Sequence, residues 1–251
     1  MSYFITGASS GIGKACALLL AKKKESMCLF SRNEEELLKV QKEVEKLGGR
    51  AIIFKGDVKN LEDLKKAVEE AKKGFGDLKN LICAAGIGYF SPFIKQEIWQ
   101  VEEMIKVNTM GVINSVYAFV PVIKEDGGRI GIVSSIQGRM GFKNMCVYGA
   151  SKFALHGFVQ GLREEVKPYK IKITLICPGT VETPFLDKAG RNELPRQARY
   201  LRVLTPEEVA KATIKAMENG KREVVIPFMA KLFLKLHDIF PALLEKIYYK
   251  L

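Results

Sequence analysis

A tyrosine and a lysine stand four residues apart, as Tyr148 and Lys152, in a segment with helical periodicity. Residues at this spacing share one face of a helix, so the two side chains are expected to lie together. A tyrosine has an ordinary pKa of about 10, and a neighbouring ammonium lowers it by stabilising the phenolate. Such a tyrosine can exchange a proton with a carbonyl oxygen while a hydride moves at carbon. The spacing alone is common on helices and equally fits a pair without a chemical role.

A serine, Ser135, ends a short apolar run that is typical of a buried strand, Ile132-Val133-Ser134-Ser135. Ligands bind at the carboxyl ends of the strands in an open parallel sheet, so its hydroxyl could hold the carbonyl oxygen on which Tyr148 acts. No GxSxG sequence surrounds either serine, which argues against a Ser-His-Asp hydrolase. Of the two histidines, His156 could point toward this site, but we favour a structural role.

The start of the chain leads from a short apolar run into a glycine-rich turn and then into a helical pattern. Glycines permit a tight turn and a close backbone approach to a pyrophosphate, whose charge a helix N-terminus attracts. The position between strand and helix favours dinucleotide binding over an ordinary surface turn. The cofactor residues expected here are Thr6, Gly7, Ser9, Ser10, Gly11, Ile12 and Gly13.

The end of the second predicted strand, Phe30-Ser31-Arg32-Asn33, carries no acidic residue that could bind the ribose hydroxyls of NAD. The guanidinium of Arg32 can instead pair with a ribose 2′-phosphate, which favours NADP(H) over NAD(H). The alternative is that Arg32 lies on the surface where a helix begins. Asp57, followed by Val58, comes after the third strand and could accept the adenine amino group or cap a helix.

Strand and helix patterns alternate along the whole chain. Short β-branched and aromatic runs predict strands at 3–5, 27–31, 51–55, 80–83, 130–133, 171–176 and 223–226. Helical periodicity predicts helices at 11–24, 34–47, 61–74, 99–106 running on through 108–124, 147–167 and 206–218. This alternation predicts an α/β protein, a single-domain doubly wound Rossmann fold with a seven-stranded parallel sheet and helices on both faces.

The composition, with 47% hydrophobic and 27% charged residues, is typical of a soluble globular protein, and no apolar run is long enough to span a membrane. The net charge is +12, but the basic residues are scattered, so nucleic acid is not an expected partner. An odd number of widely spaced cysteines argues against a zinc site or a disulfide framework, and no metal is expected; they are Cys16, Cys28, Cys83, Cys146 and Cys177. The N-terminus lacks a secretory signal, so we expect a cytoplasmic protein, with peripheral membrane contact as an alternative.

Together, the glycine-rich turn, the strand-end serine and the Tyr-x-x-x-Lys pair resemble the short-chain dehydrogenase/reductase family over residues 2–226. The resemblance implies an NAD(P)(H)-dependent oxidoreductase that interconverts a carbonyl and a secondary alcohol. In that family the residue at Tyr148 is the general acid/base and that at Ser135 orients the substrate carbonyl. The residue at Lys152 binds the nicotinamide ribose and lowers the tyrosine pKa, and that at Asn108 holds a water linking the lysine to solvent.

The resemblance also implies further cofactor contacts and an assembly. The contacts follow the fourth and sixth strands, at Ala85, Gly86, Pro178, Gly179, Val181 and Thr183. The family usually has Asn-Asn-Ala-Gly where this chain has Cys83-Ala84-Ala85-Gly86, so small residues remain but the polar side chains that tie the neighbouring backbone are missing. Because the family commonly forms homodimers or homotetramers, we expect a homo-oligomer.

The expected substrate residues are mostly apolar, which favours a hydrophobic small-molecule carbonyl or alcohol; they are Gly88, Gln137 and Phe142, beside Ser135 and Tyr148. Residues 180–204 follow the sixth strand where a lid over a ligand would lie, and they contain Arg191, Arg196, Arg199 and Arg202. These arginines leave two interpretations, a solvated loop or a site for an acidic acyl carrier protein, which would make the enzyme a 3-oxoacyl-carrier-protein reductase.

Residues 228–251 form an apolar and basic extension beyond a catalytic domain of residues 1–227. Its apolar positions recur at helical spacing over more than a normal stripe, and Pro241 should break or kink the helix. Three interpretations stay open: packing on a second subunit or over the pocket, contact with a membrane surface, and ordinary core. Membrane contact would suggest a lipid-like substrate. Outside the enzymes, the alternative is a module that only senses the dinucleotide.

Overall fold

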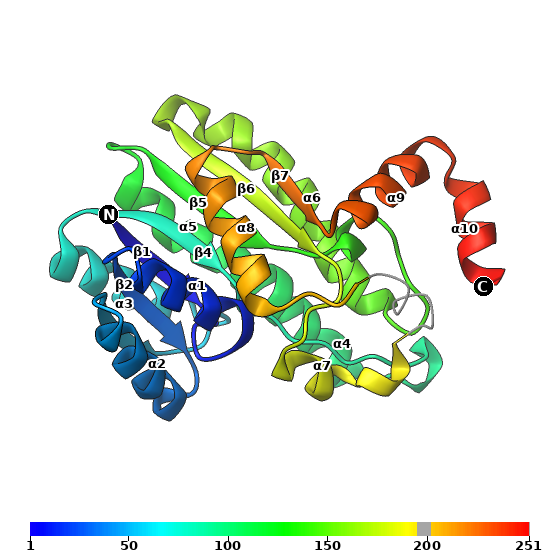
Figure 1. Cartoon of the computed structure of the whole chain (residues 1–251), viewed down its shortest axis with the longest axis horizontal. Coiled ribbons are helices and arrows are strands. Elements are labelled where there is room, and N and C mark those ends of the chain that lie inside the picture. The colour runs from blue at the N-terminus through cyan, green and yellow to red at the C-terminus, as the bar shows by residue number, and fades with distance from the viewer. Residues whose placement is uncertain (195–201, 251) are drawn as a thin grey trace.

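The computed structural model describes residues 1–194 and 202–250, with side chains described to residue 246. Its strands form one parallel sheet in the order β3-β2-β1-β4-β5-β6-β7 (Figure 1). They are β1 (Ser2–Thr6), β2 (Ser26–Ser31), β3 (Arg50–Lys55), β4 (Leu78–Cys83), β5 (Gly128–Val133), β6 (Ile171–Pro178) and β7 (Glu223–Ile226). The predicted doubly wound sheet is confirmed.

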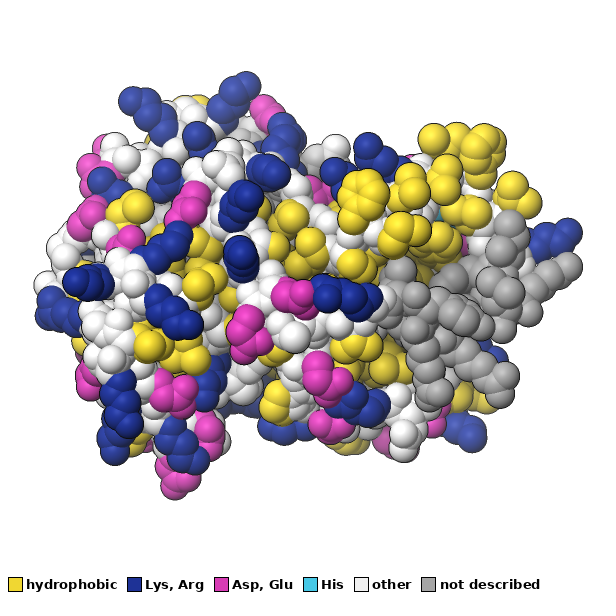
Figure 2. All heavy atoms as spheres, viewed as in Figure 1, with side chains coloured by type: hydrophobic (Ala, Val, Ile, Leu, Met, Phe, Trp, Pro, Cys, Tyr) yellow, Lys and Arg dark blue, Asp and Glu magenta, His cyan; other side chains and the backbone are white. Residues whose placement is uncertain are grey.

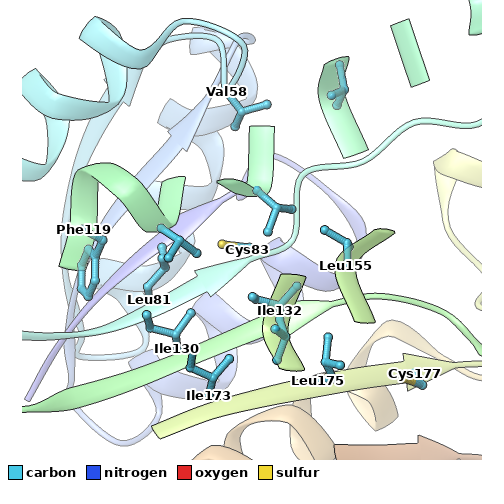
Figure 3. Packing of buried hydrophobic residues seen from close by; sticks show 14 of the residues in the cluster. Val58, Leu81, Cys83, Phe119, Ile130, Ile132, Leu155, Ile173, Leu175 and Cys177 are labelled. Atoms are coloured by element: carbon cyan, nitrogen blue, oxygen red, sulfur yellow. The ribbon is translucent and has the colours of Figure 1, made fainter. Parts of the chain in front are cut away.

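Helices cover both faces of the sheet because successive strand side chains point to opposite sides. From β1, Tyr3 and Ile5 pack in the cluster that includes α1 (Gly11–Ala21), α2 (Glu34–Lys46) and α8 (Pro206–Glu218). Phe4, between them, packs on the other side in the cluster that includes α3 (Leu61–Phe75), α5 (Gly111–Ile123) and α6 (Cys146–Val166), which Figure 3 shows from close by.

Two local features were not expected from periodicity. The helix predicted through 99–124 consists of α4 (Ile98–Ile105), one π-helical turn at Lys106–Met110, and α5. Within 180–204, a short helix, α7 (Pro184–Ala189), begins at a proline in its first turn. Single π turns often mark functional sites because they shift the side chains that follow them.

The last strand leads directly into α9 (Phe228–Ile239), and α10 (Pro241–Lys250) packs against it (Figure 1). The break falls at the proline, as predicted, because proline suits the first turn of a helix but not its interior. Among the helices that the structure describes, none combines the length and the apolar character that crossing a bilayer requires.

Candidate active site

One large cavity of about 1190 Å³ lies at the carboxyl edge of the sheet. The glycine-rich turn after β1 and the loop after β4 line one part of it, and α7 and α9 line another. Strand order reverses between β1 and β4, and the crevice at such a switch point is where doubly wound sheets bind ligands.

The glycine-rich turn lies in direct backbone contact with the loop after β4. Gly7 has a φ of +67°, and a Cβ there would stand 2.6 Å from the Ala85 nitrogen. A Cβ on Gly13 would stand 2.3 Å from the Gly7 carbonyl oxygen, and Thr6 Oγ1 accepts a hydrogen bond from Ala85 N. Only glycine therefore fits at positions 7 and 13.

Most of the predicted cofactor residues line this cavity. They are Gly7, Ser9, Ser10, Gly11, Ile12, Arg32, Asp57, Val58, Ala85, Gly86, Tyr148, Lys152, Pro178, Gly179, Val181 and Thr183. Thr6 and Gly13 are not lining residues and support the turn from behind.

The charged end of the cavity holds Arg32 and Asp57. The Arg32 side chain is 61% exposed, and its Nη1 lies 3.9 Å from Glu103 Oε1. Asp57 lines the cavity, and its Oδ1 accepts a hydrogen bond from the Lys59 backbone at 3.0 Å in the turn before α3. The alternative that Asp57 caps the following helix is wrong, because the Asn60 side chain caps α3 by accepting a hydrogen bond from Glu62 N. The contact of Asp57 with adenine stays a prediction.

Ser135, Tyr148 and Lys152 meet on the cavity wall. Ser135 follows β5 and forms a side-chain hydrogen bond with Tyr148 from the first turn of α6. Lys152, one turn further along, donates a hydrogen bond from Nζ to the Val133 carbonyl at 3.0 Å. Its Nζ lies 5.8 Å from the centre of the Tyr148 ring.

Burial shifts the pKa of both ionisable groups toward the neutral form. It raises the pKa of Tyr148 to about 12, against a smaller lowering by the hydrogen bond to Ser135, and it lowers the pKa of Lys152 to about 8. The expected lowering of the tyrosine pKa by the lysine is not seen here, because desolvation of the phenolate outweighs the other effects.

The buried lysine leads to a prediction about stability. Since its pKa is about 8 in the folded chain and 10.5 unfolded, the unfolded chain binds more protons between these values, and stability rises with pH there. Below about pH 8, burying the ammonium costs up to about 3 kcal/mol. The free energy of unfolding of the wild type should therefore increase from pH 7 to 10, and that of Lys152→Met should not show this increase. Urea unfolding at a series of pH values measures both. The exposed Lys211→Met is the control, and a Lys152→Met curve parallel to wild type contradicts the assignment.

The side chain of Asn108, in the π turn, ties three elements together. Its Oδ1 accepts from Ile87 N at 2.8 Å, and its Nδ2 donates to Ile87 O and to Ser151 Oγ. Ser151 Oγ in turn donates to the Tyr148 carbonyl at 2.7 Å. The Asn108 side-chain amide thus forms its hydrogen bonds with other groups of the protein, and these bonds position the loop after β4 against the start of α6.

The remaining part of the cavity is apolar. The Tyr148 ring packs edge-on against Phe90, with centroids 5.5 Å apart, and against Phe185 of α7 at 5.8 Å. Phe142, Gly88 and Gln137 line the cavity as predicted. Sequence reasoning did not single out Phe185, Ser151 or the α9 residues Ala230, Phe233 and Leu234, because nothing in their spacing relates them to Tyr148.

Residues 180–204 begin and end side by side. Val181 forms a parallel bridge with Leu204, whose backbone N–H donates to the Thr180 carbonyl at 2.9 Å. Of the arginines in this segment, Arg191 pairs with Glu182 and Asp187, and Arg202 pairs with Glu208. Arg196 and Arg199 lie outside the described residues.

His156 does not line the cavity. Its Nε2 lies 3.7 Å from Cys177 Sγ, which in turn lies 3.6 Å from Glu223 Oε1, although sequence spacing indicated no such cluster. Arg139 donates to Glu223 Oε2 at 3.2 Å and also pairs with Asp238 of α9. A guanidinium thus already holds the carboxylate, and this network connects β7 to α9.

A doubly wound sheet with a glycine-rich first turn and a cleft at its switch point defines the Rossmann class of nucleotide-binding folds. A profile of the short chain dehydrogenases matches residues 2–194. The chain belongs to the short-chain dehydrogenase/reductase family of oxidoreductases.

Several relatives carry specific names. The ketoacyl reductase HetN of Nostoc sp. is 30% identical over 251 residues, which cover 97% of this chain and 86% of HetN. The 3-ketodihydrosphingosine reductase of Bos taurus is 31% identical over 226 residues, covering 86% of this chain and 68% of that protein. The alcohol dehydrogenase of Thermococcus sibiricus, solved with 5-hydroxy-NADP, superposes with a TM-score of 0.79 at 26% identity, over 90% of this chain and 95% of that one.

Proposed function

We propose that this protein is an NADPH-preferring oxidoreductase that interconverts a carbonyl and a secondary alcohol on an apolar small molecule. The observation that carries the proposal is that Ser135, Tyr148 and Lys152 lie on the wall of a cavity that also contains the glycine-rich turn. The names of a ketoacyl reductase and a 3-ketodihydrosphingosine reductase among the relatives support carbonyl reduction. Purified protein should oxidise NADPH with a panel of apolar ketones, followed by nicotinamide absorbance.

The residues present fit a dinucleotide. The cavity volume exceeds the roughly 300–1,000 Å³ usual for small ligands, which supports a cofactor and a substrate side by side. The N-terminus of α1 follows the glycine-rich turn and would attract the pyrophosphate. At Gly86, a Cβ would stand 3.7 Å from Lys152 Nζ, so the absence of a side chain opens space for a ribose beside the ammonium. When bound, the nicotinamide supplies or accepts the hydride at carbon.

The chain's own groups would handle the proton. Because the pKa of Tyr148 is about 12, its phenol is protonated at neutral pH and can act as a general acid toward a carbonyl oxygen. Ser135 would donate a second hydrogen bond to that oxygen. The Lys152 ammonium would stabilise the phenolate left after proton transfer, and Asn108 would hold the surrounding loop as a positioning residue.

Arg32 would select the phosphorylated dinucleotide. The open depression beside it is lined by Lys55 and Lys188 and also by Glu34 and Glu35. Because Lys55 Nζ lies 3.6 Å from Glu34 Oε2, Arg32 and Lys188 are the cations left to attract a 2′-phosphate. Since a charge-assisted hydrogen bond contributes about 1.5–3 kcal/mol, Arg32→Ala should weaken NADPH binding about 10- to 100-fold and leave NADH binding nearly unchanged. Titration followed by nicotinamide fluorescence measures both, with Lys42→Ala on α2 as a control of equal charge. Equal losses for the two cofactors would remove Arg32 from this role.

The substrate end supports an apolar molecule with one further polar group. The Gln137 side chain is buried, and its Oε1 has no hydrogen-bond partner among the described residues although the side chain lines the cavity. A buried acceptor of this kind is costly unless a ligand satisfies it, so we expect a hydrogen-bond donor near the substrate carbonyl. Arg191 and Arg202 are already paired with Glu182 and Glu208. Because these two arginines would have to leave their partners to bind an acidic acyl carrier protein, we favour a small molecule as the substrate.

The proposal also covers a lid over the substrate, the division of the chain into a catalytic domain and an extension, and the oligomeric state. Residues 180–204, with α7 on the cavity wall, would act as a lid over the substrate. Residues 1–227 would be the catalytic domain and 228–251 an extension. We expect a homodimer or homotetramer, as is common in the family, which sedimentation velocity measures.

A further inference from the structure

The helix α9 is apolar on both of its sides. Ala230 and Leu234 are buried, and together with Phe233 they line the cavity. On the opposite side the large apolar residues face outward. A helix with apolar residues on two opposite sides is normally buried on both, whereas the apolar residues of α9 are buried on only one.

The outward side of α9 continues onto α10 as one apolar area, which we call the tail surface. Along α9 its members are three or four residues apart, and two further residues continue it to α10. All have exposed fractions between 42% and 73%; they are Phe228, Leu232, Leu236, Ile239, Phe240 and Leu243. Figure 2 shows hydrophobic side chains gathered at the upper right, over α9 and the start of α10. A patch of this kind on a water-soluble fold marks an interaction surface.

The charges around the tail surface are mainly positive. Lys231 and Lys235 are exposed and each precedes a leucine of the apolar stripe, so they form its border along α9. The nearby acids have partners within the chain, since Asp238 pairs with Arg139 and Glu245 Oε1 lies 3.3 Å from His237 Nε2. With a net charge of +12, a second copy would repel this border, whereas anionic lipid headgroups complement it.

We propose that the tail surface docks on an anionic lipid bilayer, with α9 and α10 lying in the interface. Met229 is 61% exposed and also lines the cavity, so the tail surface and the cavity meet at this residue. Resting on the proposed oxidoreductase function, this placement assigns the substrate class: an apolar carbonyl compound that partitions into the bilayer and enters the cavity beside α9. The Arg139 ion pairs hold α9 to β7 and thereby orient the cavity toward the lipid.

The experiment is co-sedimentation of the full chain with vesicles of phosphatidylcholine alone and of phosphatidylcholine with phosphatidylglycerol. We expect binding to the anionic vesicles that weakens as salt rises. The double variant Lys231→Gln/Lys235→Gln should bind about fivefold more weakly per lysine removed. Leu232→Glu/Ile239→Glu should lose binding by more than tenfold. Leu38→Glu on α2 is the matched control, because Leu38 and Leu232 are 43% and 44% exposed, and it should bind as wild type.

Turnover of a short, water-soluble ketone without vesicles separates the two proposals. Leu232→Glu/Ile239→Glu should keep wild-type turnover there, since neither residue lines the cavity. Vesicle binding without turnover of any carbonyl would refute the proposed function and leave docking supported. Turnover without vesicle binding would overturn docking. A loss of oligomeric mass in the glutamate variant, with no vesicle binding by wild type, would assign the tail surface to a second copy and overturn the proposal as well.

Discussion

Tyr148→Phe should reduce turnover by about a thousandfold or more, because general acid catalysis by the phenol is lost. NADPH binding should stay close to wild type, since the ring still packs between Phe90 and Phe185 and only the hydrogen bond with Ser135 disappears. The measurement is steady-state NADPH oxidation with a ketone substrate, beside a fluorescence titration of cofactor binding.

The matched control for this variant is Tyr89→Phe. Tyr89 lines the same cavity, but its ring packs against Trp99, with centroids 5.2 Å apart, rather than beside Ser135. Removing this second phenol should leave turnover within a few-fold of wild type. Undiminished turnover in Tyr148→Phe would show that another group supplies the proton, and the proposed mechanism would then be wrong.

Gly7→Ala should unfold the cofactor turn or displace it. At a φ of +67° an alanine costs about 1 kcal/mol for its backbone conformation. Its Cβ would also stand 2.6–2.8 Å from backbone atoms of Ala84 and Ala85, which adds about 1–3 kcal/mol of overpacking. We expect a loss of roughly 3 kcal/mol in the free energy of unfolding and more than tenfold weaker NADPH binding.

The comparison with Gly76→Ala isolates the steric effect. Gly76 has a φ of +71° at the end of α3, and a Cβ there has nothing within 4 Å. This variant should cost only about 1 kcal/mol and bind NADPH normally. Urea unfolding and fluorescence titration give both quantities. Similar losses for the two variants would mean that backbone conformation alone explains the glycine at position 7.

Local patterns predicted the architecture, and most of the site residues predicted from them lie on the cavity wall. Short β-branched and aromatic runs predicted all seven strands, because strands of a parallel sheet are buried on both faces, and helical periodicity predicted the main helices, which bury one face. The same patterns predicted that Ser135, Tyr148 and Lys152 lie close together, since strand ends and helix starts meet at one edge of a parallel sheet. Patterns did not predict the π turn at Lys106–Met110 or the short helix α7, which periodicity over longer windows does not detect.

The C-terminal extension, residues 228–251, shows what such patterns do not predict. Its apolar residues and Pro241 predicted two helical pieces, but the sequence left several partners open for them. The structure lays Phe233 and Leu234 of α9 against the cavity and leaves Leu232 and Leu236 exposed. A helix apolar on both sides has no preferred face of its own, so the end of β7 and the ion pairs of Arg139 decide which side turns inward.

The sequence by itself determined the sheet, the glycine-rich turn and the pairing of Tyr148 with Lys152, because each depends on spacing within one element or on the geometry of a parallel sheet. Only the tertiary structure decided the ionisation of that pair. Burial raises the pKa of Tyr148 to about 12 and lowers that of Lys152 to about 8, and burial is set by elements distant in the chain. The aromatic wall from α7 and the apolar wall from α9 are likewise products of packing, which no local spacing encodes.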